Sequence, residues 1–285
     1  MQLPQLDDRY SIEERIGHGG MGVVYRAHDH VLDRDVAIKI AAATVDAATA
    51  ERLIRESRIL ARLEHPGIVT VHDAGVDASG RPWYAMRLVR GERLDQWSIG
   101  KSRGERMRLF LQLCDAIAFA HAHHVIHRDI KPSNVMVGAF GEVLVLDWGI
   151  ALLSDDHQTE AIVAGTPGFM APEQLRGDSQ RIDERTDVFG LGALLATLIG
   201  DGERSARPLE AIVARACADD VAHRYADVES LAQDVRNWLD GFPVAAYRER
   251  WWERLHRVYQ RNQAILLLFL AYAIVRLVIL WWRGV

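Results

Sequence analysis

The sequence predicts an α+β fold with two lobes, a small lobe rich in β-strands followed by a larger helical lobe, and then a final apolar helix. Residues 10–90 contain short runs of branched and aromatic side chains, interrupted by one helical segment. From Leu94 onward, apolar residues recur at helical spacing. We therefore expect a leader at 1–9, the small lobe at 10–90, the larger lobe at 91–243, an amphipathic segment at 244–263 and an apolar helix at 264–282.

The elements of the small lobe follow from local composition. Its helix is predicted over about 47–63 and ends before Pro66, because proline disfavours a helical conformation in the residue that precedes it. Gly91 indicates the joint between the lobes, and Gly241 with Pro243 indicates the end of the globular part. The strands are predicted at 23–28, 36–41, 68–75 and 83–89.

Composition excludes several classes of function. A chain of 285 residues, 49% of them hydrophobic, can bury a sizeable core. Its formal net charge of -5 provides no broad basic field, so we expect no nucleic-acid partner. The two cysteines, Cys114 and Cys217, lie far apart without ligand-spaced neighbours, which indicates neither a disulfide framework nor a zinc site.

A glycine-rich segment lies near the start of the small lobe. Gly17, Gly19 and Gly22 satisfy the pattern G-x-G-x-x-G, and glycines let backbone N–H groups approach phosphate oxygens closely. Alone, the pattern also fits a plain hairpin or a dinucleotide-binding turn. A strand containing Val24 follows it, where a dinucleotide-binding turn would lead into a helix.

One lysine stands in an apolar strand downstream of these glycines. Lys39 ends the run Val36-Ala37-Ile38-Lys39, and an inward-pointing lysine needs an anionic partner to offset its desolvation. Glu56, in the predicted helix, is the natural candidate. A solvated strand lysine and a solvated helix glutamate would be the ordinary alternative for either residue alone.

The segment His127–Asn134 provides the strongest chemical signal in the chain. It places a carboxylate, an amine and a carboxamide, those of Asp129, Lys131 and Asn134, within six residues. Phosphoryl transfer needs a group that positions the attacking hydroxyl, a cation near the γ-phosphate and oxygen ligands for Mg²⁺. Asp147, which follows another apolar strand, can supply a second oxygen ligand.

In this order, the motifs GHGGMGVVY, HRDIKPSN, GTPGFMAPEQ and DVFGLG resemble the signature of bacterial eukaryotic-like serine/threonine protein kinases, members of the protein kinase superfamily. The resemblance covers about residues 10–240. It implies a bilobal protein kinase fold and phosphorylation of Ser and Thr hydroxyls on proteins, with ATP and either Mg²⁺ or Mn²⁺. The small and larger lobes would then be the N-lobe and the C-lobe of a kinase.

The resemblance also implies roles for individual residues. Asp129 would accept or orient the proton of the substrate hydroxyl, Lys131 would neutralise the γ-phosphate, and Asn134 with Asp147 would bind Mg²⁺. Met86 would be the gatekeeper, while Ala37 and Met136 would sandwich adenine. The complete set expected to contact ATP is Ile16, Gly17, Gly19, Gly22, Val24, Ala37, Lys39, Glu56, Met86, Leu88, Val89 and Met136.

Further residues would support the segment His127–Asn134, the catalytic segment. By resemblance, Thr166 belongs to the loop that receives the residue after the phosphorylated one, and together with Lys131 it favours Ser/Thr over Tyr substrates. Glu173 would pair with Arg224, and Asp187 would brace the catalytic loop. The physical reason is the same in both cases, because a buried charge needs a partner.

Arg128, which precedes Asp129, adds a cation that a phosphothreonine could neutralise. We therefore expect autophosphorylation at Thr159, with Ser154 as the second site, and a homodimer in which one chain modifies the other.

Two features depart from the family pattern. Trp148 stands where phenylalanine is usual, and we expect it to pack under the helix that carries Glu56. Only about ten residues, Asp201 to Glu210, separate two predicted helices, which puts the recognition of protein substrates in doubt. Two alternatives therefore stay open, a catalytically weak pseudokinase that acts as a membrane scaffold and a small-molecule phosphotransferase.

The tail predicts attachment to a membrane. The nineteen residues from Ala264 to Trp282 are apolar apart from Arg276. As a helix they would measure roughly 28 Å, close to the ~30 Å thickness of the hydrocarbon core. Most nearby arginines precede the run, which predicts a single span in the cytoplasmic membrane with the kinase domain in the cytoplasm. The segment 247–263 would lie on anionic lipid, and the alternative for 264–282 is a buried or surface-lying helix.

Overall fold

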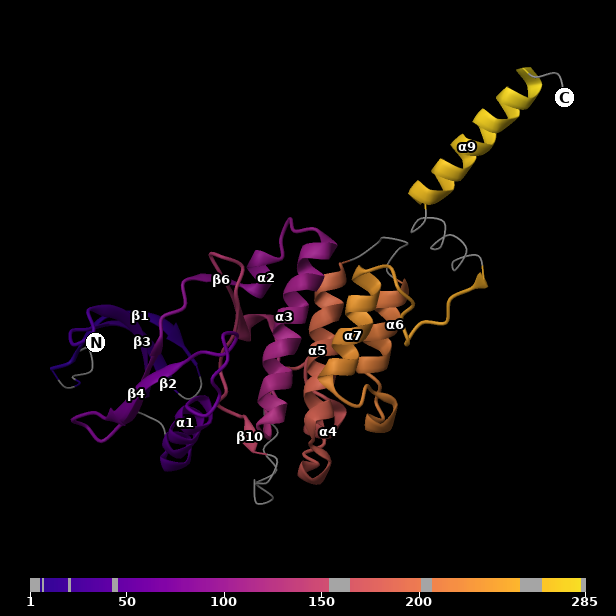
Figure 1. Cartoon of the computed structure of the whole chain (residues 1–285). Coiled ribbons are helices and arrows are strands. Elements are labelled where there is room, and N and C mark those ends of the chain that lie inside the picture. Colours follow the sequence, from indigo (N-terminus) through magenta and orange to yellow (C-terminus); the bar gives the residue numbers. More distant parts are fainter. Residues whose placement is uncertain are drawn as a thin grey trace.

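The computed structural model describes residues 6, 8–19, 22–42, 46–153, 165–200, 207–251 and 263–282. These residues form a β-sheet lobe and a helical lobe that lie end to end, with one further helix apart from both (Figure 1). The predicted α+β architecture of two lobes is confirmed.

The small lobe is built on a five-stranded antiparallel sheet with strand order β1-β2-β3-β5-β4. Helix α1 begins after Asp46, whose carboxylate caps it by accepting a hydrogen bond from the Thr49 N–H. The helix contributes Leu53 and Leu60 to the main hydrophobic core, so it ties the sheet to the larger lobe. The elements are β1 (Tyr10–His18), β2 (Gly22–Asp29), β3 (Arg34–Ala41), α1 (Ala47–Leu60), β4 (Val71–Val76) and β5 (Pro82–Arg87).

The larger lobe is mainly helical, and its longer helices α3, α5, α6 and α7 pack side by side (Figure 1). Its first long helix begins with a capping box, in which Ser102 and Glu105 satisfy each other's backbone N–H groups. Its helices are α2 (Leu94–Trp97), α3 (Arg103–Ala122), α4 (Pro172–Leu175), α5 (Glu184–Ile199), α6 (Arg207–Ala216) and α7 (Val228–Leu239), with short 3₁₀ turns at Pro132–Asn134, Ser179–Arg181 and Val221–His223.

Two small sheets lie where the lobes meet, and they carry the catalytic segment. The first has the order β6-β8-β9, and the second pairs β7 with β10. Residues 127–134 therefore run between a strand of one sheet and a strand of the other, which fixes both ends of the segment. The strands are β6 (Gly91–Arg93), β7 (Val125–Ile126), β8 (Val135–Gly138), β9 (Val143–Val145) and β10 (Leu152–Leu153).

Trp148 lies in the main core with no exposed surface. Its indole packs on the His127 ring, with 4.5 Å between the ring centroids, and its Nε1–H donates to the Val145 carbonyl. Leu60 of α1 belongs to the same core cluster. The larger ring thus packs on the catalytic segment, and it shares one core with the helix that carries Glu56.

The chain that follows α7 continues to pack on the larger lobe. Val244 is buried, and the N–H groups of Ala245 and Ala246 donate to the Asp234 carboxylate at 2.7 and 3.0 Å. This docked turn lies at the start of the segment predicted to be amphipathic, so lipid contact could begin only beyond it. Most of the remaining segment, 252–262, lies outside the described residues.

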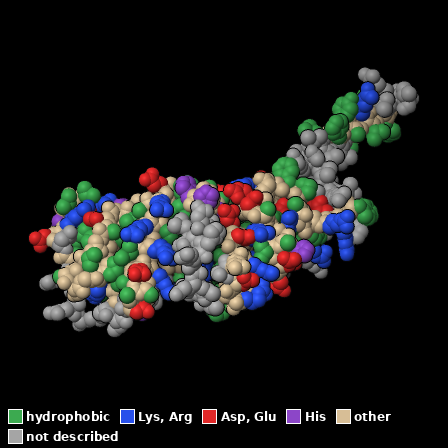
Figure 2. Space-filling view, turned by 90° about the horizontal axis from the view of Figure 1, so that it is seen from below, with side chains coloured by type: hydrophobic (Ala, Val, Ile, Leu, Met, Phe, Trp, Pro, Cys, Tyr) green, Lys and Arg blue, Asp and Glu red, His purple; other side chains and the backbone are tan. Residues whose placement is uncertain are grey.

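Helix α9 (Gln263–Trp282) lies apart from the lobes (Figure 1), and its visible surface is largely hydrophobic (Figure 2). The side chains of Leu268 and Phe269 are 71% and 68% exposed. Within the described parts of the chain, no helix meets the length and apolarity that crossing a membrane requires. The predicted span at 264–282 is therefore not confirmed.

Candidate active site

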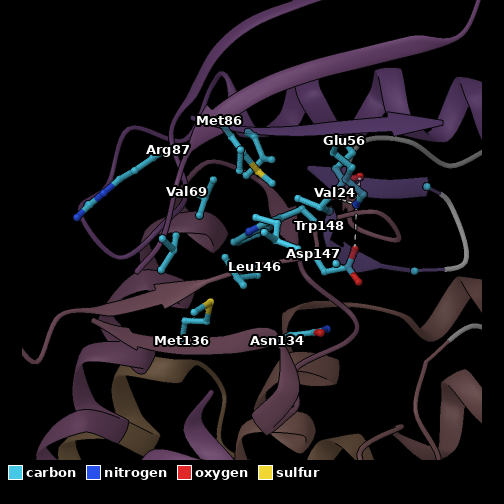
Figure 3. Close-up of a pocket in the computed structure, with 18 of the residues that line it drawn as sticks. Val24, Glu56, Val69, Met86, Arg87, Asn134, Met136, Leu146, Asp147 and Trp148 are labelled. Atoms are coloured by element: carbon cyan, nitrogen blue, oxygen red, sulfur yellow. Dashed lines mark hydrogen bonds and ion pairs between the residues drawn. The ribbon is translucent and has the colours of Figure 1, made fainter. Parts of the chain in front are cut away.

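A cleft of about 490 Å³ lies between the two lobes. Every residue predicted to contact ATP lines it, together with Asn134 and Asp147. Val24 and Met86 come from the small lobe, and Met136 and Asn134 face them from the larger lobe (Figure 3). The cleft is also lined by residues for which no contact with ATP was predicted: His18, Leu60, Val69, Tyr84, Arg87, Arg93, Ser133, Leu146 and Trp148.

The three glycines of the first motif differ in what they require. A Cβ on Gly22 would clash with the Ile40 carbonyl oxygen of the neighbouring strand, so β2 and β3 can pair there only without a side chain. A Cβ on Gly19 would meet nothing within 4 Å, and one on Gly17 would make ordinary contact with Val24. Gly22 is therefore needed by the sheet itself, whereas Gly17 and Gly19 have room for a side chain.

Lys39 forms a buried ion pair with Glu56. Its Nζ lies 2.8 Å from both carboxylate oxygens of Glu56 and 3.3 Å from Oδ1 of Asp147. Burial lowers the pKa of Lys39, but the two carboxylates outweigh that effect and the net shift is upward. Burial also raises the pKa of Asp147, yet Lys39 reverses the shift and keeps that carboxyl ionised. The predicted pairing thus joins strand β3, helix α1 and the segment after β9.

The catalytic segment holds Asp129 through three side chains. Lys131 Nζ donates to Asp129 Oδ2 and to Thr166 Oγ1, each at 2.6 Å. Asn134 Nδ2 donates to the backbone carbonyl and to Oδ2 of Asp129, both at 2.9 Å. The Thr166 hydroxyl lies 3.3 Å from the other carboxylate oxygen, Oδ1. Asp129 is therefore fixed mainly through Oδ2, while Oδ1 accepts only the longer bond from Thr166 and keeps a lone pair for a ligand.

Asp187 supports this segment from α5. Its carboxylate accepts hydrogen bonds from the backbone N–H groups of His127 and Arg128, both at 2.8 Å, and from His121 Nε2 at 2.8 Å. Arg128 has a φ of 68°, and Asp147 has a φ of 59°. Residues other than glycine rarely adopt this left-handed backbone conformation, so the surrounding hydrogen bonds must hold the strained backbone in place.

The stability provided by His121 should depend on pH. Burial lowers its pKa, but the bond to Asp187 more than compensates, so the net shift is upward. Its contribution is then complete below the unfolded pKa of about 6.5 and is lost as the pH rises through the higher folded value. We expect His121→Leu to reduce the free energy of unfolding by about 1.5–3 kcal/mol at pH 5.5.

Denaturant unfolding at pH 5.5, 7 and 8.5 checks this expectation. The difference between the wild-type chain and His121→Leu should shrink steadily across the series. His121→Gln, which keeps a neutral donor, serves as the control, and its difference from wild type should vary less with pH. A His121→Leu deficit that is equal at all three values would show that the ring acts by packing alone.

The predicted pair of Glu173 and Arg224 is fully buried. Two parallel hydrogen bonds of 2.7 and 2.8 Å join the guanidinium to the carboxylate. Thr186 adds a third contact to the carboxylate at 3.0 Å. Burial raises the pKa of Glu173, but the bond to Arg224 reverses the shift and holds the pKa below its usual value. This pair fixes α4, and with it the end of the segment that carries Thr166.

Some predicted sites cannot be placed. Ser154 and Thr159 lie outside the described residues, as does the short link at 201–206. His121 and Tyr84 are functional candidates that sequence reasoning missed, because each lies in a mostly apolar run where a polar side chain has no distinctive spacing. Leu146 could have been found, since it directly precedes Asp147.

The donor set at the inner end of the cleft fits a hard divalent cation. Asn134 uses its amide nitrogen on Asp129, which leaves its Oδ1 oxygen to act as a ligand. The Asp147 side chain is 51% exposed, and its carboxylate borders the same cleft. Mg²⁺ takes oxygen ligands and commonly shares them with substrate phosphates.

Comparisons with known proteins agree with this arrangement. The family model described as the protein kinase domain matches residues 10–226. The chain is 30% identical to serine/threonine-protein kinase PknD of Protochlamydia amoebophila, over 84% of this chain and 31% of the relative. It is 33% identical to serine/threonine-protein kinase PknB of Mycobacterium leprae, over 85% of this chain and 45% of the relative.

A probable serine/threonine-protein kinase of Streptomyces coelicolor is likewise 33% identical, over 86% of this chain and 42% of the relative. The chain thus spans less than half the length of these curated relatives. The domain match alone covers most of the chain, from the first strand of the sheet to just past the arginine that pairs with Glu173. On this evidence, the chain belongs to the protein kinase family.

Proposed function

We propose that this chain transfers the γ-phosphate of ATP to serine and threonine hydroxyls of proteins. One observation supports the proposal above all. Asp129 is held by Lys131, Asn134 and Thr166 beside a cleft in which the Lys39–Glu56 pair is already assembled. The names of the relatives, which are serine/threonine-protein kinases, agree with the class of hydroxyl.

In the proposed binding mode, adenine lies between Ala37 and Met136, and the phosphates extend toward Lys39. Lys39 provides a fixed positive charge there, because its ammonium group donates hydrogen bonds to both carboxylate oxygens of Glu56. Asn134 and Asp147 would hold Mg²⁺, or Mn²⁺ in its place. When bound, the cation neutralises charge on the phosphates.

In the proposed reaction, the substrate hydroxyl donates a hydrogen bond to Oδ1 of Asp129 and attacks the γ-phosphorus. A bond forms between the hydroxyl oxygen and phosphorus, while the bond from phosphorus to the bridging oxygen of ADP breaks. The hydroxyl proton passes to Asp129. Lys131, which lies 2.6 Å from both Asp129 and Thr166, is placed to offset the charge on the transferred group.

Transfer of labelled phosphate from ATP by the full chain in detergent tests this proposal. We expect label on the chain itself and on a general protein substrate, only in the presence of Mg²⁺ or Mn²⁺, and phosphoserine and phosphothreonine without phosphotyrosine. No transfer under any of these conditions would favour the pseudokinase scaffold. Label on a small molecule alone would favour the phosphotransferase alternative.

We also propose that the chain autophosphorylates within a homodimer, mainly at Thr159 and next at Ser154. Phosphopeptide mapping of the active chain checks the sites. Mixing active chain with a size-tagged Asp129→Asn chain checks the mode, because label on the tagged chain requires transfer between two molecules. Label confined to the active chain would contradict the homodimer.

We propose further that the C-terminal segment attaches the chain to the cytoplasmic membrane as a single span, with the kinase domain in the cytoplasm. The exposed apolar side chains of α9 support attachment, and the arginines at 248–261 support this orientation. In cell fractionation, a Leu268→Glu and Ile274→Glu double variant should leave the membrane fraction. The matched control is Phe140→Glu, which changes an exposed apolar residue on the larger lobe.

Retention of the double variant would contradict attachment through α9. For the wild-type chain, a carbonate wash of the membrane fraction distinguishes a membrane-spanning helix from a surface-lying one, because only a spanning chain stays with the lipid.

A further inference from the structure

Tyr84 lies directly opposite Lys39 in the small-lobe sheet. Strands β3 and β5 are antiparallel, and Lys39 and Tyr84 are partners in their register. Partners across an antiparallel pair place their side chains on the same face of the sheet, with Cβ atoms about 5 Å apart. Both side chains therefore point toward the face on which α1 packs, and both line the cleft.

The Glu56 carboxylate lies against this pair of side chains. Lys39 donates to both of its oxygens. The Tyr84 hydroxyl lies close enough that it lowers the pKa of Glu56, while the carboxylate raises the pKa of Tyr84. Glu56 is 1% exposed and Tyr84 is 2% exposed, so water is almost excluded from both. A buried carboxylate is stabilised in its charged form by each donor it gains.

The Tyr84 hydroxyl is suited to act as that donor. Burial, and to a smaller extent the charge of Glu56, raises the pKa of Tyr84 well above 10. The hydroxyl therefore keeps its proton at neutral pH and can donate a hydrogen bond. The charged and titratable groups that face Glu56 are Lys39 from β3, Tyr84 from β5 and Asp147 from the segment after β9. Burial raises the pKa of Glu56 overall; of these groups, Lys39 and Tyr84 lower it and favour the ionised carboxylate, whereas Asp147 raises it.

We propose that Tyr84 is a positioning residue, whose hydroxyl holds the Glu56 carboxylate in the orientation that pairs with Lys39. Lys39 is shared between Glu56 and Asp147, at 2.8 and 3.3 Å, so its position depends on where Glu56 lies. The Tyr84 hydroxyl, on strand β5 next to β3, limits the rotation of the Glu56 side chain away from Lys39. This inference rests on the proposed phosphoryl transfer, because it assigns Tyr84 a role in assembling that site.

Tyr84→Phe tests the proposal in the full chain, because it removes only the hydroxyl. The pKa of Glu56 should rise when this donor is lost. The acidic limb of the kcat/KM profile for ATP should then move up by about one pH unit, since hydrogen bonds to charged groups contribute on this scale. Tyr225→Phe is the matched control, because it removes a buried hydroxyl bonded to Asp234 at 2.8 Å, away from the cleft.

A second measurement does not depend on catalysis. Hydrogen exchange of the α1 peptide, residues 47–60, should become about tenfold faster in Tyr84→Phe and stay unchanged in Tyr225→Phe. An unmoved acidic limb together with unchanged exchange in Tyr84→Phe would overturn the proposal and leave Tyr84 as packing. If the wild-type chain transfers no phosphate, the proposed function fails, and the exchange result alone decides whether Tyr84 holds the helix.

Discussion

Asp129→Asn should lower phosphate transfer by about 10²–10⁴-fold while leaving the fold intact. Asparagine has the same shape, so it can still accept hydrogen bonds from Lys131 and Asn134 through its carbonyl oxygen. It lacks the negative charge that attracts and receives the hydroxyl proton. The loss should therefore appear in kcat, with little change in the KM for ATP. Asp129 is not among the residues that line the cleft proposed to bind ATP; it lines a smaller pocket beside it.

Single-turnover transfer and thermal unfolding, measured on the same preparations, check this expectation. The control is Asp115→Asn, which removes an exposed carboxylate of α3 that pairs with Arg236. It should transfer phosphate at the wild-type rate. An Asp129→Asn chain with at least half of the wild-type kcat would contradict the role given to Asp129.

Arg224→Ala should lower the free energy of unfolding by about 3–5 kcal/mol. The change leaves the Glu173 carboxylate buried with Thr186 as its remaining side-chain donor. It also removes the hydrogen bonds from the guanidinium to the Ala218 and Arg185 carbonyls, at 2.8 and 3.0 Å. So large a loss is comparable with the whole free energy of unfolding of many domains, so the yield of folded Arg224→Ala chain should fall sharply.

An exposed pair in the same lobe provides the contrast. Arg236 lies 3.0 Å from Asp115, with both side chains partly in water, so Arg236→Ala should cost about 1 kcal/mol or less. Denaturant unfolding compares the two variants at pH 7. Because the pKa of Glu173 is lowered in the fold, the wild-type advantage over Arg224→Ala should persist above the unfolded pKa of about 4.3 and shrink in acid. Equal effects of the two substitutions would contradict the assignment of Glu173–Arg224 as a buried structural pair.

The parts of the site that could be predicted from the sequence are those carried by short segments. Asp129, Lys131 and Asn134 lie within six residues, so local geometry alone brings them together. Lys39 and Glu56 are seventeen residues apart, but burial of an inward-pointing lysine demands a carboxylate, and the neighbouring helix offers one. Such local or charge-driven pairings need little knowledge of the fold.

The contacts that could not be predicted depend on how distant elements are packed. His121 and Asp187 are sixty-six residues apart and meet only because α3 and α5 lie side by side. Tyr84 looks like an ordinary strand residue until the register of β3 with β5 places it opposite Lys39. The turn at 244–247 follows a glycine and a proline, which predict the end of the globular part. Two of its backbone N–H groups nevertheless donate hydrogen bonds to Asp234.

The central claim is that the terminal phosphate of ATP, with a metal ion held by Asn134 and Asp147, lies within reach of Asp129. Crystals grown with Mn²⁺ and a non-hydrolysable ATP analogue test it most directly, since the anomalous signal of manganese identifies the metal. We predict manganese bound to both side chains, with the γ-phosphate facing Oδ1 of Asp129. Nucleotide bound outside the cleft, or manganese away from Asn134 and Asp147, would contradict this account.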